Sequence, residues 1–312
     1  MAETQIVRIQ VISDLHTEAG PFAEPDPSDL ATGADIVILA GDIARAPDAV
    51  AVAARMFPDV PLVSVSGNHE NYDTGMTIDE GIDAMRRAAL GHASAECRPV
   101  HVLEDEEAVV EVRGISLRFL GSCTWTDFAL FGDPVRDRMI VERGLNDFRL
   151  IRGRSVNLLG LFLGRGATPF HTSEWLDRHD ASREFLRSRL AVPHDGPTVV
   201  VTHHLPSMRS VAQQYRKSRL SAGFASRLDD LVGMGATLWV HGHTHSSHMW
   251  RAPGGTLVAC NPAGYADLTH AGAVVRENAR FDPRLVIDIR RGGPDGLWRA
   301  GPEPARRART QG

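Results

Sequence analysis

The sequence predicts an α/β domain in which parallel strands alternate with helices. Five short, apolar, β-rich segments recur along the chain, at residues 6–13, 34–40, 61–66, 198–202 and 237–240. Each segment runs directly into polar residues, as a buried strand does where it reaches the edge of a sheet. Helical stretches lie between the segments, and this alternation is typical of a sheet with parallel strands.

The first half of the chain supplies three of these strands. They read IVRIQVIS at residues 6–13, ADIVILA at 34–40 and PLVSVS at 61–66. Helical periodicity predicts helices over residues 47–57 and 78–90, after the second and third strands. The polar residues at the three strand ends are Asp14-Leu15-His16, Gly41-Asp42 and Gly67-Asn68-His69-Glu70.

The second half repeats the pattern after an interruption. VVEV and ISLRFLG, within residues 109–120, predict an antiparallel hairpin. Residues 125–172 lose periodicity and gather Arg, Asp and Gly, so we expect a loop-rich cap there. Helices are predicted over residues 173–190 and 220–232. The last two strands end at His203-His204 and at His241-Gly242-His243-Thr244-His245.

The chain of 312 residues is long enough for one large α/β domain, which we expect over residues 1–290. Beyond it, residues 291–312 are rich in Pro, Gly and Arg and poor in apolar side chains. A segment of this composition buries too little apolar surface to offset the entropy of ordering. We therefore expect a disordered C-terminal tail.

Composition argues against several classes of partner. The net charge of −5 provides no global positive field to attract nucleic acid, so we regard a nuclease as unlikely to fit this chain. No run approaches the roughly 18 apolar residues that span a bilayer, and the N-terminus lacks a basic-then-apolar leader. Cys97, Cys123 and Cys260 show neither metal nor disulfide spacing. We expect a cytoplasmic protein without membrane contact.

The polar residues at the strand ends form a candidate metal centre. An Asp-x-His triplet is expected about once by chance in such a chain, whereas Gly-Asn-His and Gly-His-x-His are each expected at about a few hundredths. Open α/β sheets bind ligands at the carboxyl ends of their strands. The set combines nitrogen and oxygen donors without thiolate, which suits Mn²⁺, Fe or Zn²⁺ better than Ca²⁺ or Mg²⁺. Its members are Asp14, His16, Asp42, Asn68, His69, His203, His243 and His245.

These motifs resemble those of the calcineurin-like metallophosphoesterase superfamily, over roughly residues 6–262. The five matching motifs read DLH, GD, GNHE, THH and GHTH. WTDF, THHLPS and NPAGY further resemble a little-characterised bacterial branch. The resemblance implies a four-layer α/β/β/α sandwich of two mixed sheets with two metal ions.

The resemblance also implies a role for each motif residue. Asp42 would bridge the two metals, and His69 would act as an acid on the leaving group without binding metal. A metal-bridging hydroxide would attack phosphorus. One metal would be held by Asp14, His16 and His245, and the other by Asn68, His203 and His243.

The second motif departs from the family pattern. Many relatives carry a carboxylate or amide three residues after the motif aspartate, where this chain has Arg45. The group that orients His69 is therefore not identified by the motif. GDIARAP also differs from the GDxVDRG of the protein Ser/Thr phosphatases, which argues against that branch.

Six further residues are candidates for supporting the centre or lining a substrate cleft. Glu70 is expected to have a structural role more often than a catalytic one. His204 and His241 are expected behind the ligands, since ligating histidines need outer partners. His248 is expected at the surface. The six candidates are Glu70, His204, His241, Arg209, Tyr72 and Asp127.

These observations favour a metal-dependent phosphodiesterase that acts on a small-molecule or nucleotide substrate. The alternatives are a phosphomonoesterase that uses the same site and a non-catalytic metal-site scaffold. The scaffold members of the superfamily lack the acid histidine, whereas His69 is present here. The sequence leaves the substrate, the native metals and the oligomeric state open.

Overall fold

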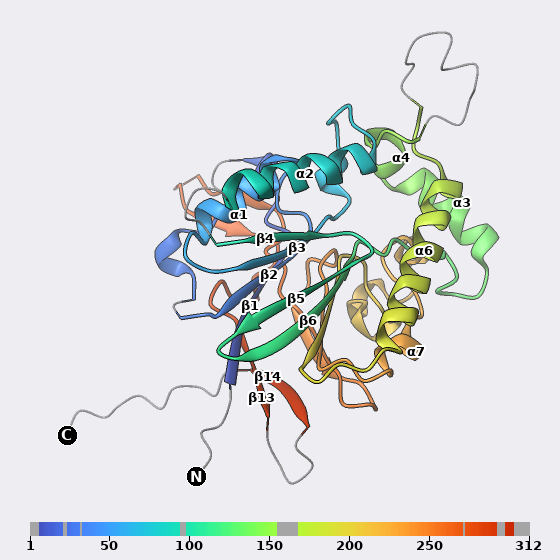
Figure 1. The fold of residues 1–312 in the computed structure, drawn as a ribbon. Helices are drawn as coiled ribbons and strands as arrows, with labels where there is room; N and C mark the ends of the chain where they lie inside the picture. Colours follow the sequence, from blue (N-terminus) through green and yellow to red (C-terminus); the bar gives the residue numbers. More distant parts are fainter. Residues whose placement is uncertain are drawn as a thin grey trace.

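Two six-stranded sheets packed face to face form the centre of the protein (Figure 1). The structure is a computed structural model that describes residues 6–20, 24–31, 33–93, 98–154, 168–270, 272–291 and 297–302. Both sheets are mixed and carry helices, as expected for the four-layer sandwich. In the described part of the chain, no helix is both long and apolar enough to cross a membrane.

The first sheet has the strand order β14-β13-β1-β2-β3-β4. Strands β1 to β4 are parallel, while β13 and β14 continue the sheet antiparallel from β1. The bounds are β1 Ile6–Ile12, β2 Ile36–Ala40, β3 Leu62–Val65, β4 Val100–Leu103, β13 Val286–Arg291 and β14 Trp298–Pro302.

The second sheet has the order β5-β6-β7-β8-β10-β9. Its middle strands β6, β7, β8 and β10 are parallel. The predicted hairpin is present as β5 and β6. Its turn places Arg113 and Gly114 at φ 52° and 73°, the left-handed conformation that a tight hairpin turn requires. The bounds are β5 Glu106–Val112, β6 Ile115–Ser122, β7 Thr198–Thr202, β8 Leu238–Val240, β9 His248–Arg251 and β10 Leu257–Cys260, with β11 Ala266–Leu268 and β12 Val274–Arg276 in a separate two-stranded ribbon.

Alternation along the strands explains the layers. In β2, Ile36 and Ile38 face the second sheet, whereas Val37 and Leu39 face the helices. Helices α1 and α2 cover the first sheet, and α6 and α7 cover the second. Because both faces of each sheet are buried, the central strands read as nearly continuous apolar runs. The helix bounds are α1 Asp48–Met56, α2 Ile78–Ala93, α3 Pro134–Gly144, α4 Asp147–Leu150, α6 Thr172–Leu190 and α7 Asp229–Val232.

The cap is more ordered than the sequence indicates. Helices α3 and α4 lie within it and gather with α6 at one end of the molecule (Figure 1). Asp133 begins α3, because its carboxylate accepts the amide hydrogen of Arg136 at 3.2 Å and Pro134 occupies the first turn. Residues 155–167 of the expected cap lie outside the described part of the chain.

The predicted helix over residues 220–232 is wrong. The structure has a 3₁₀ helix at Arg219–Gly223 and only a single α-helical turn, α7. Between them, the amide of Ser226 donates to the carbonyl of Leu205 at 3.1 Å. A long-range backbone pair therefore replaces the local helical bonds that the sequence pattern favours.

The expectation of a disordered tail is also wrong for residues 298–302, which form β14. This strand pairs with β13 over five residue pairs, and Ala300 enters the core between the sheets. β14 contains too few apolar residues to be recognised from the composition of residues 291–312. The remaining tail residues, 292–296 and 303–312, and Cys97 lie outside the described residues.

Candidate dinuclear metal centre

The predicted ligands come from the ends of five strands that meet at one edge of the two sheets. Asp14 and His16 follow β1, Asp42 follows β2, and Asn68 follows β3. His203 follows β7, and the pair His243 and His245 follows β8. The structure thus brings all seven predicted metal ligands together.

Many of these residues adopt a backbone conformation that non-glycine residues rarely use. Of the eleven non-glycine residues with positive φ in the described chain, five are predicted ligands, with φ between 44° and 67°. Such conformations cost free energy and persist only where the surroundings enforce them. The five are Asp14, His16, Asp42, His243 and His245.

Asp14, His16 and His245 form the first ligand cluster. The Nε2 atoms of His16 and His245 are 2.9 Å apart, and the Nε2 of His245 lies 3.6 Å from Asp14 Oδ1. The Nδ1 atoms face outward to carboxylates, His16 to Glu18 at 3.1 Å and His245 to Glu277 at 2.6 Å. With the Nδ1 hydrogens donated to carboxylates, the two Nε2 lone pairs converge.

Asn68, His203 and His243 form the second ligand cluster. The Nε2 of His203 lies 3.1 Å from both Asn68 Oδ1 and His243 Nδ1. The Nδ1 of His203 faces the carbonyl of Ala40 at 2.9 Å, which directs the Nε2 lone pair into the cluster. All three side chains are buried. The donors of this cluster converge just as those of the first cluster do.

Asp42 lies between the two clusters. Its Oδ2 is 3.8 Å from His16 Nε2 and 3.4 Å from His203 Nε2. Burial opposes its ionisation, but His203 and His69 hold the pKa of the Asp42 carboxyl well below its usual range. In return, Asp42 raises the pKa of the buried His203 to about 10. The buried Asp42 carboxylate therefore lies within reach of both clusters.

Two glycines allow the loops to approach this closely. A Cβ on Gly67 would lie 2.2 Å from Asp42 Oδ1, and a Cβ on Gly41 would lie 2.5 Å from His203 Nδ1. Gly41 also has φ 83°. Space therefore requires the glycine of the GNHE motif, and both space and backbone conformation require the glycine of the GD motif.

The donor set fits two metal ions. Facing nitrogen lone pairs and carboxylate oxygens repel one another unless a cation or proton lies between them. In each group, Asp14, His16 and His245 or Asp42, His203 and His243, the ligand atoms lie within 4.8 Å of one another. His243 Nε2 is buried without a hydrogen-bond partner. Imidazole and carboxylate ligands suit Mn²⁺, Fe or Zn²⁺.

His69 stands beside the clusters with both ring nitrogens engaged. Nδ1 is 2.9 Å from Glu18 Oε1, and Nε2 is 3.2 Å from the hydroxyl of Tyr265. The ring stacks on Tyr72 with centroids 4.1 Å apart. Burial lowers the pKa of His69, but the Asp42 and Glu18 carboxylates outweigh burial and raise it. The histidine is therefore biased toward the protonated form.

Glu18 lies outside every sequence motif, and Tyr265 ends the NPAGY motif but was not among the predicted site residues. Burial raises the pKa of Glu18, but hydrogen bonds with His16 and His69 lower it to about 2, so the carboxylate is ionised. Arg45, which occupies the usual carboxylate position, faces Asp73 at the surface at 3.4 Å. The only sequence signal for Glu18 is its place in the short turn that follows His16.

Glu70 ties the second and third motifs together. Its carboxylate accepts the amide hydrogens of Asp42, Ile43 and Gly67 at 3.0, 2.9 and 2.7 Å. Burial and the nearby Asp42 charge raise the pKa of Glu70 to about 8, while the three amide donors favour its ionised form. Glu70 holds loops in place and does not face the cavity.

Tyr72 connects a predicted ligand to the cap. The Asn68 amide donates to the Tyr72 hydroxyl at 3.0 Å, and that hydroxyl donates to Asp147 Oδ2 at 2.9 Å. This orientation of the Asn68 amide turns its oxygen toward His203. Burial and the Asp147 carboxylate raise the pKa of Tyr72, so the hydroxyl keeps its proton.

The other four candidates lie at different depths. His204 is buried, with Nδ1 3.1 Å from the Cys123 carbonyl and its ring 4.5 Å from that of His243. His241 is also buried and faces away toward β9. Arg209 stacks over Trp250 at 4.1 Å, and Asp127 accepts the amide hydrogen of Ala129. Neither Arg209 nor Asp127 lines the cavity beside the centre.

A cavity of about 380 Å³ opens beside the two clusters. Its floor includes Asp42, Asn68 and His69. Its walls combine apolar and polar side chains from the cap and from the loop after β7, including Leu145, Leu205, Val211, Leu220, Phe224 and Tyr215. The space is adequate for a small molecule with one polar end at the clusters.

The fold and the centre define a metal-binding α/β sandwich with its ligands at the strand ends. The family model for calcineurin-like phosphoesterases matches residues 7–247, so the chain belongs to that family. It is therefore a metal-dependent phosphoesterase, as the motifs implied.

Of the two solved structures that follow, the first supports this fold. A phosphopantetheinyl hydrolase from Mycobacterium tuberculosis matches with a TM-score of 0.60 and 20% identity, covering 82% of this chain and 89% of that one. A dimetal phosphatase from Danio rerio matches with a TM-score of 0.39 and 14% identity, covering 91% and 92% of the two chains. A comparison with curated protein sequences finds no match.

Proposed function

We propose that this protein hydrolyses small phosphodiesters, with His69 as the acid that protonates the leaving oxygen. The observation that carries this proposal is the position of His69. It lies at the floor of the cavity, next to both ligand clusters, with its Nδ1 held by Glu18. A general acid must reach the leaving oxygen while its other nitrogen fixes the ring.

Seven residues would hold the two metal ions. Asp14, His16 and His245 would hold one, Asn68, His203 and His243 the other, and Asp42 would contribute to both. When bound, the ions polarise phosphate oxygens and lower the pKa of a water molecule between them. Because Asp42 approaches both clusters, it would set the distance between the two metal sites.

His69 performs the proton transfer. In its protonated form, Nδ1–H donates to Glu18, and Nε2–H donates to the Tyr265 hydroxyl until a leaving oxygen takes that place. Tyr265, 3.2 Å from Nε2, restricts the direction of that bond. Burial lowers the pKa of His69, but the Asp42 and Glu18 carboxylates raise it above its usual value, which favours the protonated acid. General acid catalysis of this kind typically contributes about 10²–10⁴-fold.

The cavity wall favours a diester over a monoester. Among the described residues that line it, none is Arg or Lys, whereas Asp147 and Glu277 are present. A monoester dianion carries more charge and gains from extra cationic side chains, while a diester monoanion needs fewer. The apolar side chains of Leu145, Leu205 and Phe224 provide a surface for the second ester group.

The test compares two chromogenic substrates on the Mn²⁺-loaded protein. We expect faster turnover of bis-p-nitrophenyl phosphate than of p-nitrophenyl phosphate. His69→Ala should lose about 10²-fold or more in kcat while retaining bound metal, because His69 acts on the leaving group. Metal content is measured on the same samples.

The other outcomes select among the alternatives. Faster monoester turnover would make the protein a phosphomonoesterase that uses the same residues. Equal losses of metal and activity in His69→Ala would make His69 a ligand. Two bound metals without turnover of either substrate would favour a non-catalytic scaffold.

A further inference from the structure

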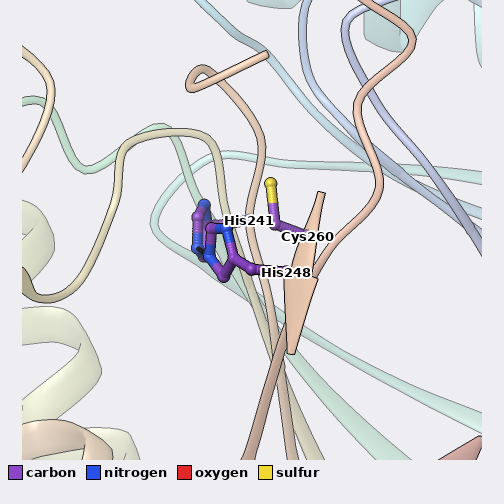
Figure 2. A group of neighbouring side chains, drawn as sticks. All are labelled: His241, His248 and Cys260. Carbon is purple, nitrogen blue, oxygen red and sulfur yellow. Dashed lines mark hydrogen bonds between the residues drawn. The ribbon is translucent and has the colours of Figure 1, made fainter. Parts of the chain in front are cut away.

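A second group of metal-ligating side chains shares no member with the two clusters of the dinuclear centre. It consists of His241, His248 and Cys260, whose ligand atoms lie within 4.8 Å of one another (Figure 2). His241 and Cys260 are buried, and His248 is half-buried. None of the three belongs to the ligand set of the calcineurin-like motifs.

Three neighbouring strands bring these side chains together. His248 and Cys260 are direct partners across the antiparallel pair of β9 and β10, so their side chains share one face of the sheet. His241 immediately follows β8, whose last residue, Val240, pairs with Ala259 of β10. The arrangement is therefore fixed by sheet register and not by a flexible loop.

The two histidines face each other in a way that calls for a cation. Their Nε2 atoms are 3.0 Å apart. The Nδ1 of His241 is 3.0 Å from the Gly242 carbonyl, and the Nδ1 of His248 is 2.9 Å from the Ser246 carbonyl. A carbonyl accepts only, so each Nδ1 carries the hydrogen and each Nε2 presents a lone pair. Two facing lone pairs at this distance repel unless something positive lies between them.

The dinuclear centre shows the same geometry. There, His16 and His245 have Nε2 atoms 2.9 Å apart, and each Nδ1 faces an acceptor oxygen. The pattern that accompanies metal ligation at the motif site thus recurs at His241 and His248. His241 and His248 lie outside the five matching motifs, so this recurrence does not follow from the family resemblance.

We propose that His241, His248 and Cys260 bind a third metal ion, Zn²⁺, at a site separate from the dinuclear centre. Two imidazoles and one thiolate are preferred zinc ligands. Ser210 Oγ lies 3.0 Å from His241 Nε2 and accepts the indole N–H of Trp250 at 3.1 Å, and it or a water molecule would be the fourth ligand. On binding, the Cys260 S–H bond breaks, its proton leaves to solvent, and a sulfur–zinc bond forms.

The site would brace the loop that carries two ligands of the dinuclear centre. His243 and His245 lie between His241 and His248 in the chain. A metal that joins both ends of this loop to β10 restricts the positions of the two ligands. The third ion is thus structural, and the proposal holds whichever phosphoester the protein cleaves.

Cobalt substitution tests the proposal through a signal that the dinuclear centre does not give. Co²⁺ bound to a thiolate has a charge-transfer band in the near ultraviolet, and no cysteine belongs to the predicted dinuclear ligand set. We expect this band when the chelator-stripped full chain is titrated with Co²⁺. It should disappear in Cys260→Ala and persist in Cys123→Ala, which removes the other described free thiol.

Zinc content provides the second measurement. Cys260→Ala and His248→Ala should each bind one equivalent less Zn²⁺ than the parent chain, with unchanged circular dichroism. His248 is half-buried, so its removal tests the site even if Cys260→Ala fails to fold. Absence of the band in the parent chain, a band that survives Cys260→Ala, or equal zinc content in parent and folded variants would overturn the proposal. These readouts do not depend on phosphoesterase activity.

Discussion

Glu18 joins the first ligand cluster to the proposed acid, His69, through two hydrogen bonds. Its Oε1 lies 3.1 Å from Nδ1 of His16 and 2.9 Å from Nδ1 of His69. The side chain is 12% exposed, which strengthens both interactions relative to a surface ion pair. One carboxylate therefore orients a predicted metal ligand and the proposed proton donor together.

We predict that Glu18→Gln lowers kcat by about 10-fold, a typical loss for an outer partner of a ligand or catalytic group. Glu18 raises the pKa of His69, and His69 acts while protonated, so activity falls as pH rises through that pKa. Without the negative charge, the falling limb of the pH–kcat profile should move to lower pH. Glu24→Gln, at a surface ion pair with Arg55, serves as the control. An unmoved limb would show that Glu18 does not position His69.

At this scale the sequence predicted the ligands better than their partners. Asp14, His16 and His243 sit in short motifs at strand ends, where residue type and spacing both carry information. Glu18 has neither, because its contact with His69 depends on how a 3₁₀ turn packs against the loop after β3. Partners that meet only through tertiary packing leave no local pattern.

The cap is connected to the metal centre through helix α4. Asp147, the first residue of α4, accepts a hydrogen bond from Tyr72, which in turn receives one from Asn68. Tyr72 is 7% exposed, and burial raises the pKa of Asp147. An element inserted in the chain between β6 and β7 thus controls the orientation of the Asn68 amide, a predicted ligand.

We predict that Tyr72→Phe destabilises the protein by about 1–2 kcal/mol, because two buried polar groups lose a partner. Metal affinity at the Asn68 site should fall with it, since the amide is no longer held. Denaturant unfolding and metal titration measure the two effects. Tyr215→Phe, at a side chain 52% exposed, should leave the free energy of unfolding unchanged. Equal stability of the two variants would contradict the connection.

Elements with strong periodicity were predictable, and elements set by distant contacts were not. Helices α1, α2 and α6 lie close to their predicted ranges. Helices α1 and α2 each bury an apolar face against the first sheet. The segment at residues 220–232 has a helical pattern too, but pairing of Ser226 with Leu205 prevents one continuous helix. The helices of the cap were missed because α3 is largely polar and exposed.

For the whole molecule, the C-terminal strands complete the first sheet. β13 pairs with β1, and β14 covers the outer edge of β13. Trp298 packs against the core between the sheets, and Ala300 is buried within it. The part of the tail that forms β14 therefore contributes to stability and is not a free appendage.

We predict that a chain ending at Arg291 has a lower Tm than the full chain, because it loses β14 and exposes the edge of β13. A chain ending at Pro302 keeps the strand and should match the full chain. Thermal unfolding of the three proteins measures the difference. Equal Tm values for all three would show that β14 adds nothing to stability.

The sequence alone predicted α/β alternation, whereas the four-layer arrangement came from the family resemblance. Alternation does not specify how many sheets form, because strands β1 to β4 and β6 to β8 have the same apolar character. The pairing of two sheets follows from the central apolar cluster that both contribute to. Which strands join which sheet depends on contacts among residues far apart in the chain.

The position of β1 has a consequence for synthesis on the ribosome. Ile6 pairs with Arg290, so β1 is synthesised long before β13, the strand that covers its second edge. Until β13 emerges, β1 presents an open edge that a chaperone or another chain can pair with. The order of translation thus leaves the first sheet incomplete until late in synthesis.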